Sequence, residues 1–292
     1  MVAAELRIDS VGAVLDELAQ RLAGPGIPPD RGGARDLIAA ILDRQRFWPT
    51  ANRDQTLSVD TVEQIRRAAE ALAGGMPFAY AVGKAAFRHL TLAVDRRVLI
   101  PRPETEVLVD LVLGVTGGRG RVADIGTGSG AIALALAAEG DYSTVLATDA
   151  SQDALDVAKG NLAAIAEDRR VRLDFRHGDL YAPLQGDRVT AIVSNPPYIA
   201  PNERGELPAS VLDWEPEAAL FAEDNGMATI DRLITGGGDV VEPGGFLLLE
   251  IDARRAGLAR SLAETNGRWS DVQVRPDLTG RDRFLVARRS TR

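Results

Sequence analysis

The sequence lacks cysteine altogether and holds only two histidines among its 292 residues. Without thiols the chain has no disulfide framework, no thiolate nucleophile and no cysteine-bound zinc or iron–sulfur site. A Ser-His-Asp triad or a histidine-rich metal site would have to be built from His89 and His177, which are far apart in the sequence. We therefore expect no metal centre.

Long uncharged stretches are also missing. No run reaches the roughly eighteen apolar residues that a membrane span requires. Acidic residues are interspersed among the apolar ones at the N-terminus, which is unlike a secretory signal peptide. We expect a cytoplasmic protein with no membrane partner.

Positive charge is scarce as well, because 34 lysines and arginines face 42 acidic residues, for a net charge of −8. This balance argues against a protein that holds nucleic acid chiefly by neutralising phosphates, so we expect no stable nucleic-acid binding. The 45% hydrophobic and 26% charged residues are typical of an ordinary globular protein. The length is about twice that of a typical domain, which predicts one large α/β domain and a smaller one. We expect a monomer.

The first eighty or so residues are predicted to be helical, because apolar positions recur there at spacings of three and four. The helices are expected at Val11–Leu22, Leu37–Leu42 and Val59–Leu72. From Phe78 to Ile100 the pattern changes toward alternation, which predicts a β-hairpin. These patterns predict a helical N-terminal domain over 1–77, a hairpin linker over 78–100 and a larger domain over 101–292.

From Arg121 onward, short apolar runs alternate with helical stretches, as in a parallel sheet with helices on both faces. Strands are predicted at Arg121–Ile125, Thr144–Thr148, Val171–Arg176, Val189–Ser194 and Gly245–Glu250. Helices are predicted at Ala131–Glu139, Ala154–Ala166 (capped by Ser151), Met227–Ile234 and Arg254–Glu264. Two final strands near Val272–Val274 and Phe284–Ala287 are close enough to pair antiparallel.

A glycine-rich segment, Asp124-Ile-Gly-Thr-Gly-Ser-Gly130, lies where the first of these strands ends and a helix begins. Glycine lets a backbone pass close to a ligand, and the free amides of a helix start favour a carboxylate or phosphate. The G-x-G-x-G spacing differs from the G-x-G-x-x-G of dinucleotide-binding proteins. A tight turn that needs glycine only for packing is the alternative explanation.

Acidic residues follow the next two strands. Asp149 can accept both hydroxyl hydrogens of a ribose. Asp179 can accept the amine of an adenine, whose ring the backbone of Leu180 can also reach. Either acid taken singly is better explained as a helix cap or a turn residue. Suitable groups at three consecutive strand ends nevertheless favour a ligand site.

The most specific motif is Asn195-Pro196-Pro197-Tyr198, directly after the strand Val189–Ser194. Two prolines remove two backbone donors, which leaves a rigid row of carbonyl acceptors beside the Asn195 side chain. Such a row binds an NH2 group, and by accepting both hydrogens it returns electron density to a nitrogen whose lone pair is delocalised. Tyr198 can stack on the planar group. A simple Asn-Pro turn is the alternative.

Together the glycine loop, the acidic strand ends and the NPPY motif resemble class I methyltransferases that use S-adenosylmethionine to methylate a planar nitrogen. Two upstream segments, Gly75-Met-Pro-Phe-Ala-Tyr-Ala-Val-Gly83 and Leu99-Ile-Pro-Arg-Pro-Glu-Thr-Glu106, resemble the release factor glutamine methyltransferases of the HemK type. The combined resemblance covers roughly Gly75 to Glu250. Adenine methyltransferases of nucleic acids share NPPY but usually lack the second segment. Taken by itself, that segment is also typical of a helix that begins with proline and has acidic residues in its first turn.

This resemblance implies an α/β fold: a seven-stranded, mostly parallel sheet of order 3-2-1-4-5-7-6, with the small helical domain and hairpin before it. It implies S-adenosylmethionine as cofactor and S-adenosylhomocysteine as product. The substrate implied is the glutamine of the Gly-Gly-Gln motif in peptide chain release factors, which the helical domain would recognise. The implied cofactor-binding residues are Gly126, Thr127, Gly128, Ser129 and Gly130 for the methionine part, Asp149 for the ribose, Asp179 and Leu180 for the adenine, and Asn195. The implied catalytic residues are Asn195, Pro196, Pro197 and Tyr198.

The sequence departs from the family in two places. After Leu249-Glu250 the family usually has a glycine and then a glutamine, whereas Ile251-Asp252-Ala-Arg254 follows here. The first seventy residues match the family only in helical character. The alternatives left open are an adenine N6-methyltransferase, a methyltransferase for another amide or amine, a nicotinamide-dependent dehydrogenase and a non-catalytic binding protein.

Overall fold

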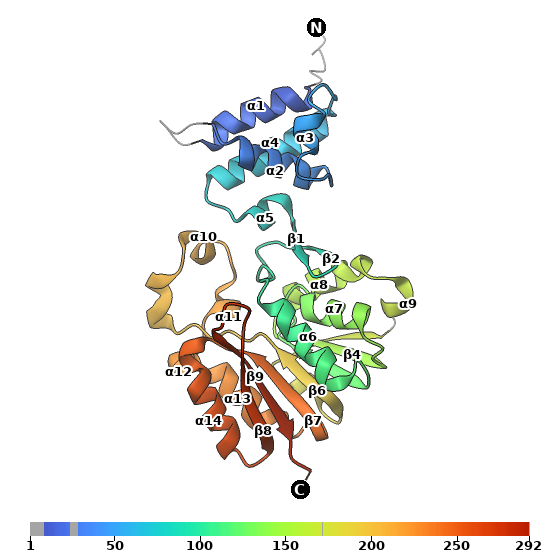
Figure 1. The fold of residues 1–292 in the computed structure, drawn as a ribbon, viewed down its shortest axis with the longest axis vertical. Helices are drawn as coiled ribbons and strands as arrows, with labels where there is room; N and C mark the ends of the chain where they lie inside the picture. The colour runs from blue at the N-terminus through green and yellow to red at the C-terminus, as the bar shows by residue number, and fades with distance from the viewer. Residues whose placement is uncertain (1–8, 24–28, 171, 292) are drawn as a thin grey trace. The chain divides into compact units, whose positions relative to one another are not determined.

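The computed structural model describes residues 9–23, 29–170 and 172–291 (Figure 1). The chain divides into two compact units, one formed by Met1–Gly83 with Ala209–Trp214 and the other by Lys84–Pro208 with Glu215–Arg292. Residues 1–8, where the helical domain was predicted to begin, lie outside the described residues. No helix in the described ranges combines the length and the apolar content needed to cross a membrane.

The first unit is helical, as predicted. Its helices are α1 (Val11–Leu22), α2 (Arg31–Ile41), α3 (Trp48–Ala51), α4 (Val59–Ala73), α5 (Phe78–Val82) and α10 (Ala209–Leu212). Leu18, Ile38 and Ile65, from α1, α2 and α4, are fully buried in its core. The second helix begins earlier than predicted because Asp30 caps it, accepting a 2.9 Å hydrogen bond from the amide of Gly33.

The predicted hairpin is present but shorter than the alternating segment. Its strands are β1 (Lys84–Phe87) and β2 (Leu90–Ala93), which pair antiparallel, while Phe78–Val82 forms α5 instead. Asn161 holds the hairpin within the second unit. Its side-chain nitrogen donates to the carbonyl of Ala93 at 3.0 Å, and its side-chain oxygen accepts from the Ala93 amide at 2.7 Å.

The second unit contains a seven-stranded sheet of order β5-β4-β3-β6-β7-β9-β8. Its strands are β3 (Arg121–Ile125), β4 (Thr144–Asp149), β5 (Leu173–His177), β6 (Val189–Ser194), β7 (Val241–Glu250), β8 (Trp269–Pro276) and β9 (Asp282–Arg289). Neighbouring strands from β5 to β7 run parallel, and β9 pairs antiparallel with both β7 and β8. Counted from the first strand of the sheet, this is the predicted order 3-2-1-4-5-7-6. Val171, predicted to begin the third strand, lies outside the described residues.

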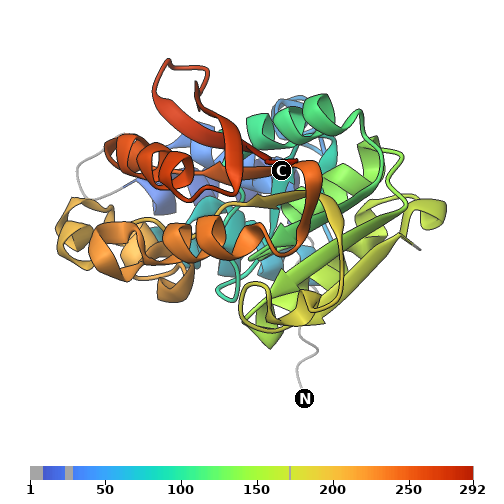
Figure 2. The ribbon, with the colours of Figure 1, turned by 90° about the horizontal axis from the view of Figure 1, so that it is seen from below.

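Helices cover both faces of the sheet, and the two layers can be followed in Figure 2 by their green and orange colours. The longer ones are α6 (Thr105–Thr116), α7 (Ala131–Glu139), α8 (Gln152–Gly160), α13 (Ala228–Gly237) and α14 (Ala256–Thr265). Shorter ones are η1 (Asn161–Ala164), α9 (Glu167–Arg170), η2 (Ala182–Leu184), η3 (Pro201–Glu206), α11 (Glu217–Leu220), α12 (Glu223–Gly226) and η4 (Ala253–Arg255).

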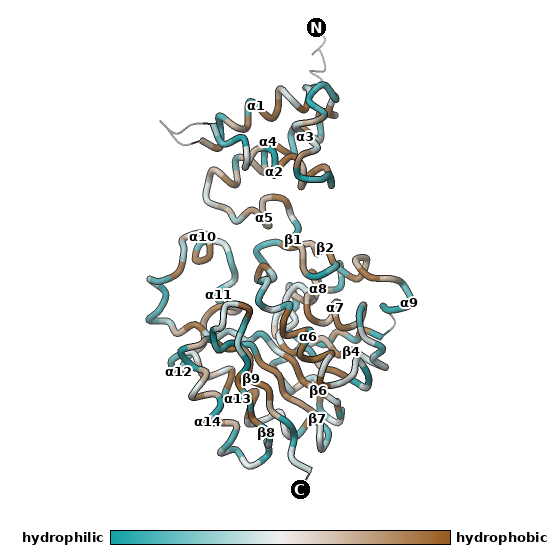
Figure 3. The backbone as a smooth tube through the Cα atoms, viewed as in Figure 1, coloured by the Kyte–Doolittle hydropathy of each residue, from teal (hydrophilic) through white to brown (hydrophobic). Residues whose placement is uncertain are grey.

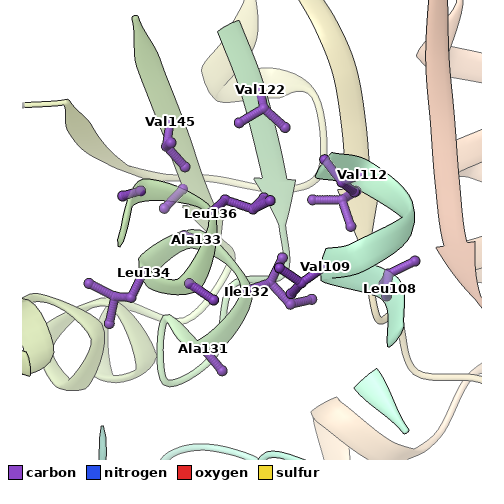
Figure 4. Close-up of a cluster of buried hydrophobic side chains, with 14 of the residues drawn as sticks. Leu108, Val109, Val112, Val122, Ala131, Ile132, Ala133, Leu134, Leu136 and Val145 are labelled. Carbon is purple, nitrogen blue, oxygen red and sulfur yellow. The ribbon is translucent and has the colours of Figure 1, made fainter. Parts of the chain in front are cut away.

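Two hydrophobic cores hold these layers to the sheet. On one face, α7 packs against β3 and β4, and α6 packs against β6 and β7. Val109, Leu136, Val122 and Val145 belong to one buried hydrophobic cluster on this face (Figure 4). On the other face, α13 and α14 cover a second cluster that includes Ile192. The central strands are hydrophobic along their length (Figure 3), as expected for strands buried on both faces.

Candidate active site

A cavity of about 430 Å³ in the second unit is lined by residues from the ends of β3, β4, β5 and β6. In parallel strands these carboxyl ends meet at one edge of the sheet, where open α/β sheets bind their ligands. The lining includes the glycine loop, Asp149, Asp179, Leu180 and Asn195. The fold therefore brings the three motif segments, which are separate in sequence, to a single cavity.

The glycine loop needs glycine for two different reasons. Gly126 and Gly128 have φ angles of 72° and 55°, in the left-handed region, but a Cβ atom at either would meet nothing within 4 Å. Open space beside the backbone suits the close approach of a ligand. At Gly130 (φ 83°) a Cβ would crowd Leu134 at 3.1 Å and Ala158 at 3.2 Å, so this third glycine serves helix packing. The packing explanation considered for the loop therefore holds at Gly130, and Gly126 and Gly128 leave room for a ligand.

Asp124 lies beneath this loop and is fully buried. Its Oδ2 accepts hydrogen bonds from the Thr127 hydroxyl at 2.6 Å and the Ala133 amide at 3.1 Å, whereas Oδ1 has no hydrogen-bond partner among the described residues. Burial raises the pKa of Asp124 to about 7. The sequence interpretation gave this residue no role, although an acid inside an otherwise apolar strand is a visible signal.

Asp149 connects the glycine loop to the following helix. Its Oδ2 accepts from the Gly128 amide at 2.9 Å, and its Oδ1 accepts from the Ser151 amide at 2.8 Å. Ser151 caps α8 as predicted, accepting from the amide of Ala154 at 3.2 Å. Burial raises the pKa of Asp149. A carboxylate has about four acceptor positions, so Asp149 retains capacity for two hydroxyl groups of a ligand.

Asp179 also lines the cavity and forms an ion pair with Arg232 of α13, which the sequence did not predict. Its side chain is 60% exposed, so the pair is accessible to solvent. Leu180, next to it, has a φ angle of 45°. This left-handed conformation is uncommon for a leucine and turns the chain at the cavity wall.

The NPPY motif contributes Asn195, Pro196 and Pro197 to the cavity wall. The Asn195 side-chain nitrogen donates to the hydroxyl of Thr105 at 3.1 Å. Within the described part of the chain, the cavity-lining residues do not include Tyr198, which was expected to stack on the planar substrate group. Its hydroxyl instead donates to Oε1 of Glu250 at 3.4 Å, and burial raises its pKa.

Thr105 and Glu250 complete this part of the site. Thr105 donates to Oε2 of Glu250 at 2.7 Å, and the two residues are 4% and 1% exposed. Burial raises the pKa of Glu250. In the sequence, Thr105 was noted only in the resemblance segment and Glu250 only as the end of a strand. The sequence signal that could have identified Glu250 is an acidic residue at the end of an apolar run.

The geometry agrees with comparisons to known proteins. The family model described as PrmC N-terminal domain matches residues 13–83, and the model described as Methyltransferase small domain matches residues 104–210. A release factor glutamine methyltransferase of Xylella fastidiosa (strain 9a5c) is 39% identical over 89% of this chain and 93% of its own length. Those of Moorella thermoacetica and Deinococcus radiodurans are 38% and 35% identical, covering 94% and 95% of this chain and 97% and 98% of their own.

The chain belongs to the release factor glutamine methyltransferase family. Solved structures share its fold at low identity. A methyltransferase from Pyrococcus furiosus has a TM-score of 0.51 at 19% identity, covering 70% of this chain and 91% of its own. The hMettl16 catalytic domain has a TM-score of 0.57 at 14% identity, covering 82% of this chain and 84% of its own. The predictions of the class I methyltransferase fold, the family and the donor S-adenosylmethionine are thereby confirmed.

Proposed function

We propose that this protein transfers a methyl group from S-adenosylmethionine to the side-chain amide nitrogen of a glutamine in peptide chain release factors. Relatives that align over nearly the whole chain are named for this activity. The observation that carries the proposal is the position of Asn195, Pro196 and Pro197 in the wall of the same cavity as the glycine loop and Asp149. No observation favours an adenine acceptor.

The polar groups that line the cavity suit those of the methyl donor. The loop from Gly126 to Gly130 has open space beside its first two glycines and precedes the free amides of α7, which suits the methionine part. Asp149 would hold the ribose hydroxyls with its remaining acceptor positions, and Asp179 with Leu180 would border the adenine. The donor supplies an activated methyl group on a sulfonium sulfur.

Asn195 and Pro196 would hold the acceptor. The Asn195 side-chain oxygen and the Pro196 carbonyl would each accept one hydrogen of the glutamine NH2 group, which fixes the nitrogen toward the donor. Holding reacting atoms about 3 to 3.5 Å apart in line is itself a large part of catalysis. No general base is obligatory, because the amide proton becomes acidic once the nitrogen carries the new methyl group.

The walls around these groups would limit water. Leu99, Pro101, Ile125 and Pro197 contribute apolar surface to the cavity. A sulfonium loses its charge as the methyl group leaves, and a site with little water favours that loss. Tyr198, whose hydroxyl donates to Glu250, would support the NPPY segment from behind this wall.

The first unit would supply substrate recognition. Its match to the PrmC N-terminal domain supports this role, because that module accompanies the catalytic domain in the family. A release factor acts on translating ribosomes, so the enzyme would work in the cytoplasm and influence translation termination. We propose that it does so as a monomer, without stable binding to nucleic acid.

A labelling experiment tests the proposed function. Purified release factor is incubated with the enzyme and S-adenosylmethionine labelled in its methyl group, and the modified residue is located by mass spectrometry. We expect label on the glutamine of the Gly-Gly-Gln motif and none on a release factor in which that glutamine is replaced by alanine. Label on another residue, or on none, contradicts the proposal.

A further inference from the structure

We propose that Thr105 and Glu250 are positioning residues that turn the Asn195 side chain so that its oxygen, and not its nitrogen, faces the substrate amide. The inference rests on the proposed function and adds the reason why the acceptor NH2 group is recognised. Neither residue lies within the NPPY motif.

The direction of the hydrogen bonds carries the inference. Both oxygens of the Glu250 carboxylate accept: Oε2 from Thr105 at 2.7 Å and Oε1 from Tyr198 at 3.4 Å. Because both carboxylate oxygens already accept, neither is left to donate a proton to Thr105. The single hydroxyl proton of Thr105 is therefore committed to Glu250. The Thr105 oxygen is left to accept, and it does so from the Asn195 nitrogen at 3.1 Å.

Asparagine presents a donor nitrogen and an acceptor oxygen in nearly the same shape, so only its partners decide which faces where. If the Asn195 amide turned over, its oxygen would face the lone pairs of the Thr105 oxygen. Its NH2 group would then face the NH2 group of the substrate. Both contacts are unfavourable. The hydrogen-bond relay formed by Glu250, Thr105 and Asn195 therefore selects the orientation in which the Asn195 oxygen accepts a substrate hydrogen.

The relay is rigid enough to do this. Thr105 and Glu250 are nearly inaccessible to solvent, so water cannot readily replace either partner. Thr105 begins α6, and its amide donates to the carbonyl of Arg102 at 3.1 Å. Glu250 ends β7, where it pairs with Phe284 of β9. The two residues are thus fixed by elements that are far apart in the sequence.

Replacement of Thr105 by valine tests the relay, because valine keeps the shape and removes the hydroxyl. The helix offers a matched control at its other end. Thr116, the last residue of α6, is partly buried, and its hydroxyl lies 2.7 Å from both the Val112 carbonyl and the Tyr142 hydroxyl. Thr116→Val therefore removes a hydroxyl of similar kind without touching the cavity.

We expect Thr105→Val to lower kcat on the release factor by about tenfold to a hundredfold, the range for a misplaced catalytic group. The KM for the release factor and the affinity for S-adenosylmethionine, measured by calorimetry, should change by less than about threefold, since neither contact is removed. Thr105→Ser restores the hydroxyl and should recover most of kcat. Thr116→Val should keep the wild-type kcat.

Three results would overturn the inference: full activity of Thr105→Val, failure of Thr105→Ser to recover activity, or a change confined to KM. If Thr105→Val does not fold, the comparison of Thr105→Ser with Thr105→Ala decides the same question. A wild-type enzyme that does not methylate the release factor contradicts the proposed function, and the inference with it. An active Thr105→Val enzyme contradicts the inference alone.

Discussion

The amide of Gly128 donates a 2.9 Å hydrogen bond to Oδ2 of Asp149, so the glycine loop after β3 and the acid at the end of β4 form one unit. This hydrogen bond therefore keeps the open space beside Gly128 next to the unused acceptor positions of the Asp149 carboxylate. Loss of the Asp149 carboxylate would remove both the proposed ribose contact and the support of the loop.

For this reason Asp149→Ala should weaken donor binding by about 1.5 to 3 kcal/mol, the value of a hydrogen bond to a charged group. Calorimetric titration with S-adenosylmethionine measures it. Asp141→Ala, which removes an exposed acid from the far end of the sheet, is the control and should leave the affinity unchanged. An Asp149→Ala protein that binds the donor as tightly as the wild type would remove this residue from the site.

Asn195→Ala should reduce methyl transfer and leave donor binding nearly unchanged, the reverse of Asp149→Ala. We expect methyl transfer to fall by about a hundredfold or more, because the substrate amide loses its positioned acceptor. Donor affinity should stay within a few fold, since the glycine loop and Asp149 are untouched. Turnover with release factor, measured beside calorimetry, separates the two quantities. Retained turnover would show that the acceptor is held elsewhere.

Asp124 should make the stability of the protein depend on pH. Its pKa is raised to about 7 by burial, whereas in the unfolded chain it titrates near its ordinary value of about 4. Between these values the folded protein holds a proton that the unfolded chain has lost, so the free energy of unfolding falls as pH rises toward 7 and levels off above it.

Urea unfolding of the wild type and of Asp124→Asn, without donor, measures this effect. The asparagine does not titrate, so the wild type should lose about 2 to 3 kcal/mol relative to the variant between pH 5 and pH 8. A difference between the two proteins that stays constant over that range would contradict the raised pKa.

Arg102 and Glu215 form an ion pair of 2.6 Å in which the Glu215 side chain is only 1% exposed. Arg102→Met would leave that carboxylate buried without its partner. We expect a loss of about 2 to 3 kcal/mol in the free energy of unfolding, below the range for fully buried pairs because a third of Arg102 is exposed. Adding Glu215→Gln should recover most of it. Equal urea midpoints for the wild type and Arg102→Met would show that the pair contributes nothing.

Gly226 lies against the NPPY segment, since a Cβ at this position would be 2.3 Å from both the Tyr198 carbonyl and the Arg255 side chain. Its φ angle is 81°. Gly226→Ala should therefore destabilise the fold by about 2 kcal/mol or more and reduce turnover. Gly257→Ala, with open space around it, is the matched control and should do neither. Thermal unfolding and turnover of both variants test this.

The helices and strands predicted most accurately are those whose pattern of apolar residues depends on burial alone. The strand Val189–Ser194 and the helix Ala131–Glu139 have the predicted bounds, because each is a mostly apolar run between clear turn residues. The helix at Arg31 was predicted to begin later, because Gly32 and Gly33 weaken the helical pattern and the cap from Asp30 outweighs them.

Segments defined by tertiary contacts were not predictable in this way. Between Ala209 and Gly226 the chain forms three short helices, and the left-handed conformation of Asn225 is held by Arg255, whose Nε donates to its carbonyl at 2.6 Å. The link from Asn195 to Thr105 spans ninety residues of sequence. Spacing within a motif carries no information about a partner that far away, so the site's polar partners came only from the fold.

The most direct test is a crystal structure of the protein with S-adenosylhomocysteine and a peptide that contains Gly-Gly-Gln. We expect the product between Asp149 and Leu180, with its sulfur toward Asn195, and the glutamine NH2 group donating to the Asn195 oxygen. A product bound outside this cavity, or a glutamine side chain turned away from Asn195 and Pro196, would contradict the assignment of the site.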